Sequence, residues 1–260
     1  MVAVTPVLEL RNLDFMYQHK PILRDVCFSL AEGEVMAVVG PSGAGKSTLL
    51  KAIALLAMPS SGEILYQGNV VFAPRAIISK SLSAEYKRAV GLVFQQLHLW
   101  PHLTVLQNVT LPLTRGKGLD EQEARAKSIA MLDRLAMSDL ANQFPSRLSV
   151  GQQQRCAIAR TLAIDPTILL LDEITSALDP ELVSSIQSLI KDIASESGRS
   201  LLVVTHQIDF AQAISHRILY LRDGTVAAFE TQIDMQASAD NGQPKPFVDS
   251  LQASIARRLS

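Results

Sequence analysis

The segment GPSGAGKST, residues 40–48, constrains the fold more than any other part of this 260-residue chain. It matches the pattern G-x-x-x-x-G-K-[ST], in which the backbone N–H groups of a glycine-rich loop surround phosphate oxygens. A short apolar run, residues 34–40, leads into the loop, and a segment with helical spacing follows over about 46–57. This strand–loop–helix order makes the match specific for a phosphate-binding loop. A glycine-rich turn without a ligand is the alternative.

The residue types of this loop assign roles to its positions. Lys46 would reach the β- and γ-phosphates of a nucleotide, and the Ser47 hydroxyl would ligate Mg²⁺. The residues expected to contact the nucleotide are Gly40, Pro41, Ser42, Gly43, Ala44, Gly45, Lys46, Ser47 and Thr48.

A second segment, LLLDE at residues 169–173, supplies carboxylates. It reads as an apolar strand that ends in two acidic residues, which places them at the carboxyl edge of a sheet, where such folds bind ligands. Since successive strand residues point to opposite sides, Asp172 is expected to face Mg²⁺ and Glu173 the attacking water. A solvated acidic pair at a strand end is the alternative.

The remaining apolar pattern predicts an α/β fold with a parallel sheet, because continuous apolar strands separated by a helix are covered on both faces. Further strands are expected at 7–15, 22–30, 61–72 (a pair around Gly68), 167–173 and 200–206, with another short one in GLVFQQ. A helix is expected over 180–195, and residues 91–163 read as mostly helical. The polar tail after residue 232 is expected to be loosely attached, with a short helix near 246–258.

The stretch RLSVGQQQR, residues 147–155, reads as the start of a helix. Ser149 would be the N-cap, and Gln152 would complete a capping box with it. Gly151 lies in the first turn, where glycine costs about 1 kcal/mol relative to alanine. Because a helix N-terminus attracts anions, we interpret this glycine as giving a phosphate close access to the backbone.

Two polar residues follow further strand ends. His206 ends the apolar run VVTH and could contact a γ-phosphate, although a structural histidine is the alternative. Gln95 follows a short strand, and its amide could ligate a metal or orient water. The other histidines are expected to be structural: His19, His98, His102 and His216.

The bulk properties narrow the class of protein. A formal net charge of −1 gives no general attraction to nucleic acid or to an anionic membrane. The two cysteines fit neither a metal site nor a disulfide framework, so a reducing cytosol is expected. No signal-peptide pattern is found, and no apolar run reaches the roughly 18 residues of a membrane span. Any work at a membrane is therefore expected to use an anchor that a partner provides.

Taken in order, GPSGAGKST, VFQQ, LSVGQQQR, ILLLDE with SALD, and VTH resemble the motifs of the nucleotide-binding subunit of ABC transporters, over about residues 7–230. The resemblance implies a P-loop NTPase (RecA-like) core with a parallel sheet, an antiparallel β subdomain and an inserted α-helical subdomain at about 91–163. It implies an ABC-type nucleotide-binding domain at 1–232 and a C-terminal tail at 233–260.

The resemblance also implies ATP and Mg²⁺ as cofactors, and it assigns residues to roles. Tyr17 would stack on adenine, and Asp179, in SALD, would be the D-loop aspartate of the family. The segment LSVGQQQR corresponds to the signature motif of the family, and its residues expected to contact ATP are Ser149, Gly151 and Gln152. The expected catalytic set is Glu173, His206 and Gln95, and the expected metal set is Ser47, Gln95 and Asp172.

By the same resemblance, two chains would pair head to tail, as a homodimer or with a paralogous cassette, so that each signature helix meets the ATP of the other chain. Transmembrane permease subunits are expected as partners, with a solute-binding protein as an indirect partner and no nucleic acid. The expected location is the cytoplasmic face of the inner membrane, as a peripheral protein. Residues 90–113, 147–163 and 171–183 are similar to importers of polar amino acids. Transport of another solute, or export, is the alternative.

Two positions depart from the family pattern. Val150 stands where the signature usually has its first glycine, and Ile174 where a proline usually follows the catalytic glutamate.

Trp100 is interpreted as a docking residue for a partner, with a core tryptophan as the alternative. Two other classes stay open: a non-transport ABC ATPase that acts on DNA or ribosomes, and a small-molecule P-loop kinase, which would have no signature helix.

Overall fold

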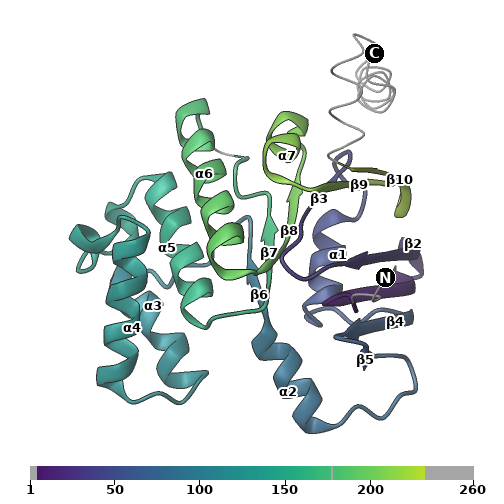
Figure 1. The fold of residues 1–260 in the computed structure, drawn as a ribbon, viewed down its shortest axis with the longest axis horizontal. Helices are drawn as coiled ribbons and strands as arrows, with labels where there is room; N and C mark the ends of the chain where they lie inside the picture. Colours follow the sequence, from purple (N-terminus) through teal and green to yellow (C-terminus); the bar gives the residue numbers. More distant parts are fainter. Residues whose placement is uncertain (1–4, 177, 232–260) are drawn as a thin grey trace.

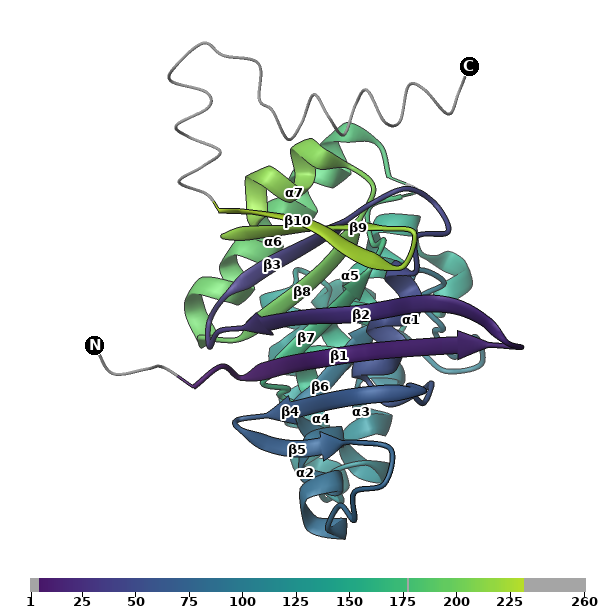
Figure 2. The ribbon, with the colours of Figure 1, turned by 90° about the vertical axis from the view of Figure 1, so that its right-hand side faces the viewer.

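A computed structural model describes residues 5–176 and 178–231, and two β-sheets frame it (Figures 1 and 2). The smaller sheet is antiparallel, with strand order β2-β1-β4-β5. Its strands are β1 (Leu8–Tyr17), β2 (Lys20–Leu30), β4 (Ser61–Tyr66) and β5 (Asn69–Phe72). This is the antiparallel subdomain that the family resemblance implied.

The larger sheet has six strands in the order β10-β9-β3-β8-β7-β6. Its strands are β3 (Val35–Val39), β6 (Val90–Val93), β7 (Ile168–Asp172), β8 (Ser200–Thr205), β9 (Arg217–Arg222) and β10 (Thr225–Thr231). All neighbouring pairs are parallel except β9 and β10. The predicted parallel sheet is confirmed, and β3, β7 and β8 are buried along their whole length.

The helices lie on both faces of the larger sheet (Figure 1). They are α1 (Lys46–Ile53), α2 (Lys80–Ala89), α3 (Val105–Arg115), α4 (Glu121–Arg134), α5 (Val150–Ala163), α6 (Pro180–Ser197) and α7 (Ile208–Ile214), with 3-10 turns η1 (Ser138–Leu140) and η2 (Pro145–Arg147). Helix α1 lies between the two sheets, whereas α3 to α6 lie on the opposite face of the larger sheet.

Alternating residues of the central strands divide the core into two parts. Leu170 of β7 and Val204 of β8 belong to the cluster around α1 and the antiparallel sheet. Their neighbours Leu171 and Val203 belong to the cluster formed with α3, α5 and α6. Burial on both faces explains why these strands read as continuous apolar runs in the sequence.

The structure corrects several boundaries. Helix α1 ends at Ile53 rather than near residue 57, since Leu55 takes a left-handed conformation with φ 52°. Helices α2 and α7 and strands β9 and β10 were not predicted, whereas the short strand predicted in GLVFQQ is confirmed as β6. The expected tail at 233–260, with its helix near 246–258, lies outside the described residues. Over residues 5–176 and 178–231, no helix is both long and apolar enough to cross a membrane.

Candidate functional site

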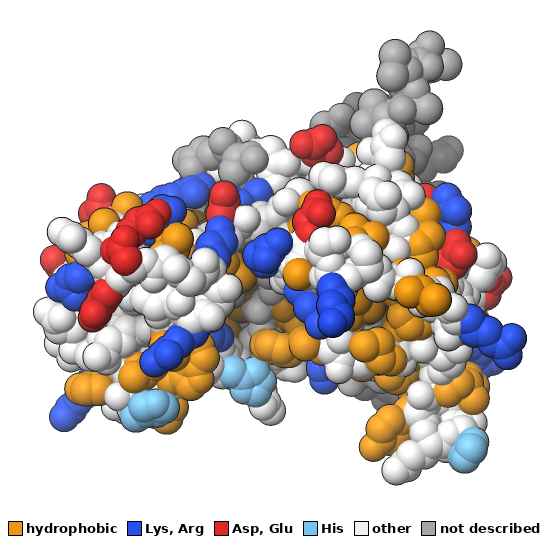
Figure 3. All heavy atoms as spheres, turned by 90° about the horizontal axis from the view of Figure 1, so that it is seen from below, with side chains coloured by type: hydrophobic (Ala, Val, Ile, Leu, Met, Phe, Trp, Pro, Cys, Tyr) orange, Lys and Arg blue, Asp and Glu red, His pale blue; other side chains and the backbone are white. Residues whose placement is uncertain are grey.

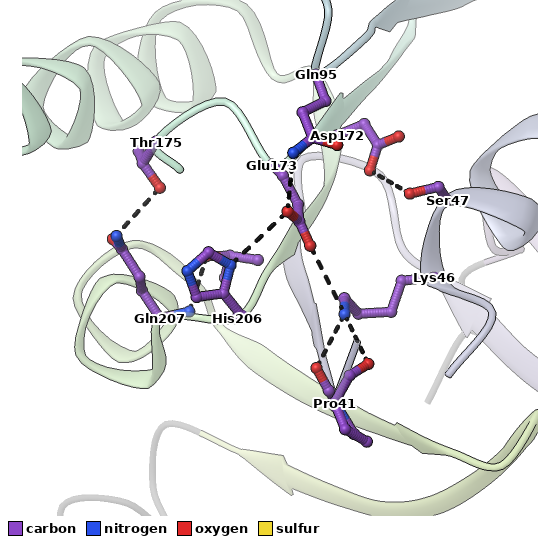
Figure 4. A network of polar contacts seen from close by, with 11 residues as sticks. Pro41, Lys46, Ser47, Gln95, Asp172, Glu173, Thr175, His206 and Gln207 are labelled. Atoms are coloured by element: carbon purple, nitrogen blue, oxygen red, sulfur yellow. Dashed lines mark hydrogen bonds and ion pairs between the residues drawn. The ribbon is translucent and has the colours of Figure 1, made fainter. Parts of the chain in front are cut away.

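Four parallel strands end at one edge of the larger sheet, and most of the candidate residues follow these ends. Strand β3 leads into the loop at residues 40–48, β6 into Gln95, and β8 into His206, while β7 ends at Asp172. Parallel pairing aligns these ends, because Val39 lies opposite Thr205 and Asp172 opposite Val204. Residues that are far apart in the sequence therefore meet in one cluster (Figure 4).

The loop at residues 40–48 presents the beginning of α1 without a side-chain cap. Its N-cap residue, Gly45, has φ 101° and makes no capping hydrogen bond. A Cβ atom at this position would lie 2.8 Å from Leu23 Cδ2, so glycine is required for both conformation and space. Because the first N–H groups of a helix have no intrahelical partner, those of α1 remain available to an anion.

Lys46 is almost completely buried beneath this loop. Its Nζ donates to the carbonyl oxygens of Gly40 and Pro41 over 2.9 and 3.0 Å, and it lies 3.7 Å from Glu173 Oε1. Burial lowers the pKa of the Lys46 ammonium, and the charge of Glu173 opposes that shift. The ammonium is thus held in place by the loop carbonyls and lies beside a carboxylate.

Asp172 and Ser47 form the second contact of the cluster. The Ser47 hydroxyl donates to Asp172 Oδ1 over 2.9 Å, and only 5% of the Asp172 side chain is exposed. Burial raises the pKa of the Asp172 carboxyl, and the hydrogen bond from Ser47 lowers it again. A hydroxyl and a carboxylate side by side are the oxygen donors that Mg²⁺ prefers, so these residues fit that ion.

Glu173 is the centre of the cluster. Its Oε2 lies 3.3 Å from Gln95 Nε2 and 3.7 Å from His206 Nδ1, so that three strand ends converge on one carboxylate (Figure 4). Asp172 and Glu173 contact different residues, while their assignment to Mg²⁺ and to the attacking water stays a prediction. Neither is a solvated surface carboxylate, since the side chain of Glu173 is only 19% exposed.

The backbone at Glu173 is strained. Its φ is +47°, a left-handed value that long side chains adopt at a cost of order 1–3 kcal/mol. The amide of Glu173 donates to Val204 O of the neighbouring strand over 3.0 Å. This bond fixes the turn that brings the carboxylate back toward the loop.

Sequence reasoning missed the residues that hold the His206 turn. Thr175 Oγ1 donates to Gln207 Oε1 over 3.3 Å, and the Gln207 amide donates to Thr205 Oγ1 over 3.0 Å. Thr175, Thr205 and Gln207 could have been identified by position, because each lies within two residues of Glu173 or His206. Short polar side chains near a strand end can bind the backbone of the next turn, as Thr205 does with the Gln207 amide.

A second group of candidate residues lies at the beginnings of α5 and α6. The predicted capping box is confirmed: the Ser149 amide donates to Gln152 Oε1 over 2.9 Å, and the Gln152 amide to Ser149 Oγ over 3.3 Å. Asp179 caps α6 by accepting from the Leu182 amide over 2.9 Å. Within residues 5–176 and 178–231, no hydrogen bond or ion pair joins this group to the loop at 40–48.

The structure gives a second reason for glycine at position 151. This residue is buried, and a Cβ atom on it would lie 3.1 and 3.3 Å from the two methyl carbons of Leu182. Glycine at this position therefore lets α5 pack against the first turn of α6 in the same chain, whereas the sequence interpretation explained it by the approach of a phosphate. A role of Gly151 in contacting nucleotide stays a prediction.

The remaining singled-out residues have distinct environments. Tyr17 is 61% exposed at the end of β1, next to the turn that leads into β2, and its stacking on adenine stays a prediction. Ile174 is buried in the core beside α5 and α6, whereas Val150 is 47% exposed. Trp100 is half-buried and is neither a core nor a fully exposed residue.

Comparisons with known proteins agree with this geometry. Residues 23–176 match the family model described as ABC transporter. The chain is 39% identical over 219 residues to the arginine transport ATP-binding protein ArtP of Haemophilus influenzae, covering 84% of this chain and 90% of that protein. It is 40% identical over 220 residues to the glutamate/aspartate import ATP-binding protein GltL of Escherichia coli K12, covering 85% and 89%.

A solved structure has the same fold. The ATP-binding cassette MJ0796, described as a dimer in a post-hydrolysis state bound to ADP and phosphate, superimposes with a TM-score of 0.76. Its sequence is 37% identical to this chain, and the match covers 86% of this chain and 98% of that one. Together, the motif order, the cluster at the sheet edge and these matches point to one family.

Proposed function

Because the chain belongs to the ABC transporter family, we propose that it is the ATP-hydrolysing subunit of a membrane importer for polar amino acids. The observation that carries the proposal is the convergence of Lys46, Gln95 and His206 on Glu173, at the edge where the phosphate loop begins α1. The names of the similar proteins support a polar amino acid as the solute, since one transports arginine and another imports glutamate and aspartate.

ATP is proposed to bind at the loop of residues 40–48, with its phosphates at the uncapped N–H groups of α1. Ser47 and Asp172 would hold Mg²⁺, and Gln95 is proposed as a further ligand. Bound Mg²⁺ neutralises charge on the β- and γ-phosphates. Tyr17, which is exposed at the end of β1, is proposed to stack on the adenine ring.

Glu173 is proposed as the general base of hydrolysis. Its carboxylate accepts a proton from the attacking water, whose oxygen forms the new bond to the γ-phosphorus while the bond to ADP breaks. His206 and Gln95, both within 3.7 Å of Glu173 Oε2, orient the water and the γ-phosphate. Lys46 remains a fixed positive charge beside them, because the loop carbonyls hold its ammonium.

The site is proposed to be completed by a second cassette. The signature residues at the beginning of α5 make no hydrogen bond or ion pair with the phosphate loop in the part of this chain that the structure describes. A similar cassette has been solved as a dimer. Two cassettes, identical or paralogous and paired head to tail, would place Ser149, Gly151 and Gln152 of one chain on the nucleotide of the other, with Asp179 beside the interface.

Permease subunits are the proposed membrane partners. The face shown in Figure 3 carries hydrophobic and basic side chains around a hollow, and a cavity of about 580 Å³ opens between α2 and the loop after α3. Large apolar side chains are also exposed beside α1 and before α2: Leu56, Met58 and Ile77. An exposed apolar surface of this kind suits a protein partner. The chain would then work as a peripheral protein at the cytoplasmic face of the inner membrane, with residues 1–232 as its nucleotide-binding domain.

Uptake measurements in cells that lack this chain test the proposal. Uptake of labelled arginine, glutamate or another polar amino acid should fall, and it should recover with the wild-type chain but not with Glu173→Gln. Uptake of an unrelated sugar serves as the control. Unchanged uptake of every polar amino acid would remove amino-acid import, whereas ATPase activity of the purified chain tests the hydrolytic function separately.

A further inference from the structure

The loop that carries Gln95 to Glu173 adopts a conformation that needs support. Leu97 and His98 both have left-handed backbones, with φ values of 44° and 45°. Such values are costly for residues other than glycine and persist only where the surroundings enforce them. The Leu97 amide donates to Phe94 O over 3.0 Å, and the rings of Phe94 and His98 meet edge to face at 5.0 Å. Gln95 lies inside this tight turn.

Arg160 of α5 binds the two strained residues directly. Its Nη1 donates to His98 O and its Nη2 to Leu97 O, each over 2.6 Å. The guanidinium also lies over the Trp100 ring, with Cζ 5.0 Å from the ring centroid. A planar guanidinium donates to two carbonyls in fixed directions while its face covers a ring, whereas an ammonium has no flat face and no fixed fork of donors. The Arg160 side chain therefore contacts this loop at Leu97, His98 and Trp100.

A buried asparagine holds the other end of the same loop. Asn108 of α3 accepts from the Trp100 amide over 2.9 Å and donates to Trp100 O and Leu103 O, each over 3.1 Å. Its side chain is fully buried. The chain from Phe94 to Leu103 is thus fixed to α3 at one end and to α5 at the other.

We infer that Arg160 is a positioning residue that couples Gln95 to helix α5. The proposal rests on the proposed function, in which Gln95 acts at the nucleotide of its own chain and the beginning of α5 acts at the nucleotide of the partner. Arg160 lies eleven residues after Ser149, about 16 Å along the helix. Because Ser149 is the N-cap of the continuous helix that carries Arg160, a displacement of α5 at Ser149 would be transmitted to the loop of Gln95 through the two carbonyls that Arg160 binds.

The chain provides a reporter and a matched control for this inference. Trp100 is the only tryptophan of the 260 residues, so tryptophan fluorescence reports on this loop and on no other part of the chain. Arg155 lies on the same helix and donates to Leu135 O and Ser185 Oγ, away from the loop. Arg155→Met therefore removes a partly buried arginine from α5 without touching residues 94–104.

The test compares Arg160→Met, Arg160→Lys and Arg155→Met in the full chain. In Arg160→Met, acrylamide should quench Trp100 more strongly, and kcat for ATP should fall about 10- to 100-fold, the loss that misplacing a catalytic group by ~1 Å produces. The KM for ATP should stay within about twofold, since the phosphate loop is unchanged. Arg160→Lys should recover part of kcat, because an ammonium can still bind one carbonyl and lie over the ring. Arg155→Met should leave the quenching unchanged.

Two results would overturn the inference. The first is wild-type kcat and wild-type quenching in Arg160→Met. The second is the same loss in Arg155→Met as in Arg160→Met, which would indicate a general weakening of α5. If Arg160→Met does not fold, wild-type kcat and quenching in Arg160→Lys would overturn it instead. A wild-type chain without ATPase activity would count against the proposed function. Acrylamide quenching of Trp100 in the wild type and in Arg160→Met, measured without nucleotide, would still test the contact between Arg160 and the loop.

Discussion

Replacing Glu173 by glutamine should separate binding of ATP from its hydrolysis. Glutamine keeps the shape of the side chain and can keep the contacts at 3.3 Å to Gln95 and 3.7 Å to His206, but it cannot take a proton from water at neutral pH. General-base catalysis contributes about 10²- to 10⁴-fold, which corresponds to roughly 2.7–5.5 kcal/mol of activation free energy. We expect kcat to fall by that factor while the affinity for ATP is retained.

The same change should leave the fold nearly intact. Glu173→Gln removes the ion pair with Lys46, whose ammonium lies 3.7 Å away. Lys46 keeps its hydrogen bonds to Gly40 O and Pro41 O, and Asp172 remains nearby as an anion. Losing one interaction with a charged group lowers the free energy of unfolding by about 1.5–3 kcal/mol. A loss of activity that is larger than the loss of stability is therefore expected.

Phosphate release under saturating MgATP measures kcat, and size-exclusion chromatography with MgATP measures the dimer that should accumulate when hydrolysis is blocked. Glu121→Gln is the matched control, since Glu121 is exposed on α4 and outside the cluster. Hydrolysis by Glu173→Gln at a rate near that of the wild type would refute the assignment of Glu173 as the base. Equal losses in both variants would do the same.

Three further changes test other parts of the structure. Ser47→Ala removes the hydrogen bond that lowers the pKa of Asp172 against the effect of burial, so the carboxyl should be protonated over more of the acidic range. The Mg²⁺ concentration needed for half-maximal activity should rise about tenfold, and more at lower pH, and a titration that matches the wild type would remove Ser47 from the metal set. Cys27 is exposed, whereas burial raises the pKa of the Cys156 thiol to about 11, so a thiol reagent should modify one cysteine in the native chain and two after unfolding. Two fast-reacting thiols in the native chain would contradict the burial of Cys156. Val150→Gly should raise kcat at saturating ATP without changing ATP affinity, while lowering helix stability by up to about 1 kcal/mol, and an unchanged or lower kcat would show that valine fits the closed site.

The structural features that could be predicted correctly from the sequence are those decided by residues close together along the chain. The phosphate loop requires a strand, a loop and a helix within a single short stretch, and the capping box requires only Ser149 and Gln152. The end of α1 shows the limit of such local reasoning. Its apolar spacing continues toward Pro59, but the Leu56 and Ala57 amides both donate to Lys51 O, which closes the helix earlier.

The cluster around Glu173 could be predicted only in part. Asp172, His206 and Gln95 each follow an apolar run, and parallel strands bring such ends to one edge. The contacts at Glu173 depend on strand order, which places β7 between β8 and β6. They also depend on the left-handed backbone of Glu173, which no residue pattern indicates. The partners of Arg160 lie more than sixty positions away in the sequence, so no local pattern indicates them either.

The beginning of α5 shows how a correct local prediction can leave part of the explanation unseen. The capping box uses the amides of Ser149 and Gln152, and Gly151 is glycine because Leu182 of α6 packs against it. Of the first turn, only the amides of Val150 and Gly151 are left to an incoming phosphate, since the first N–H groups of a helix have no intrahelical partner. Val150 is 47% exposed, whereas Gly151 is buried against α6. Under the proposed head-to-tail pairing, Val150 would act on hydrolysis through the approach of the partner's nucleotide, because the packing of α5 against α6 is decided at Gly151.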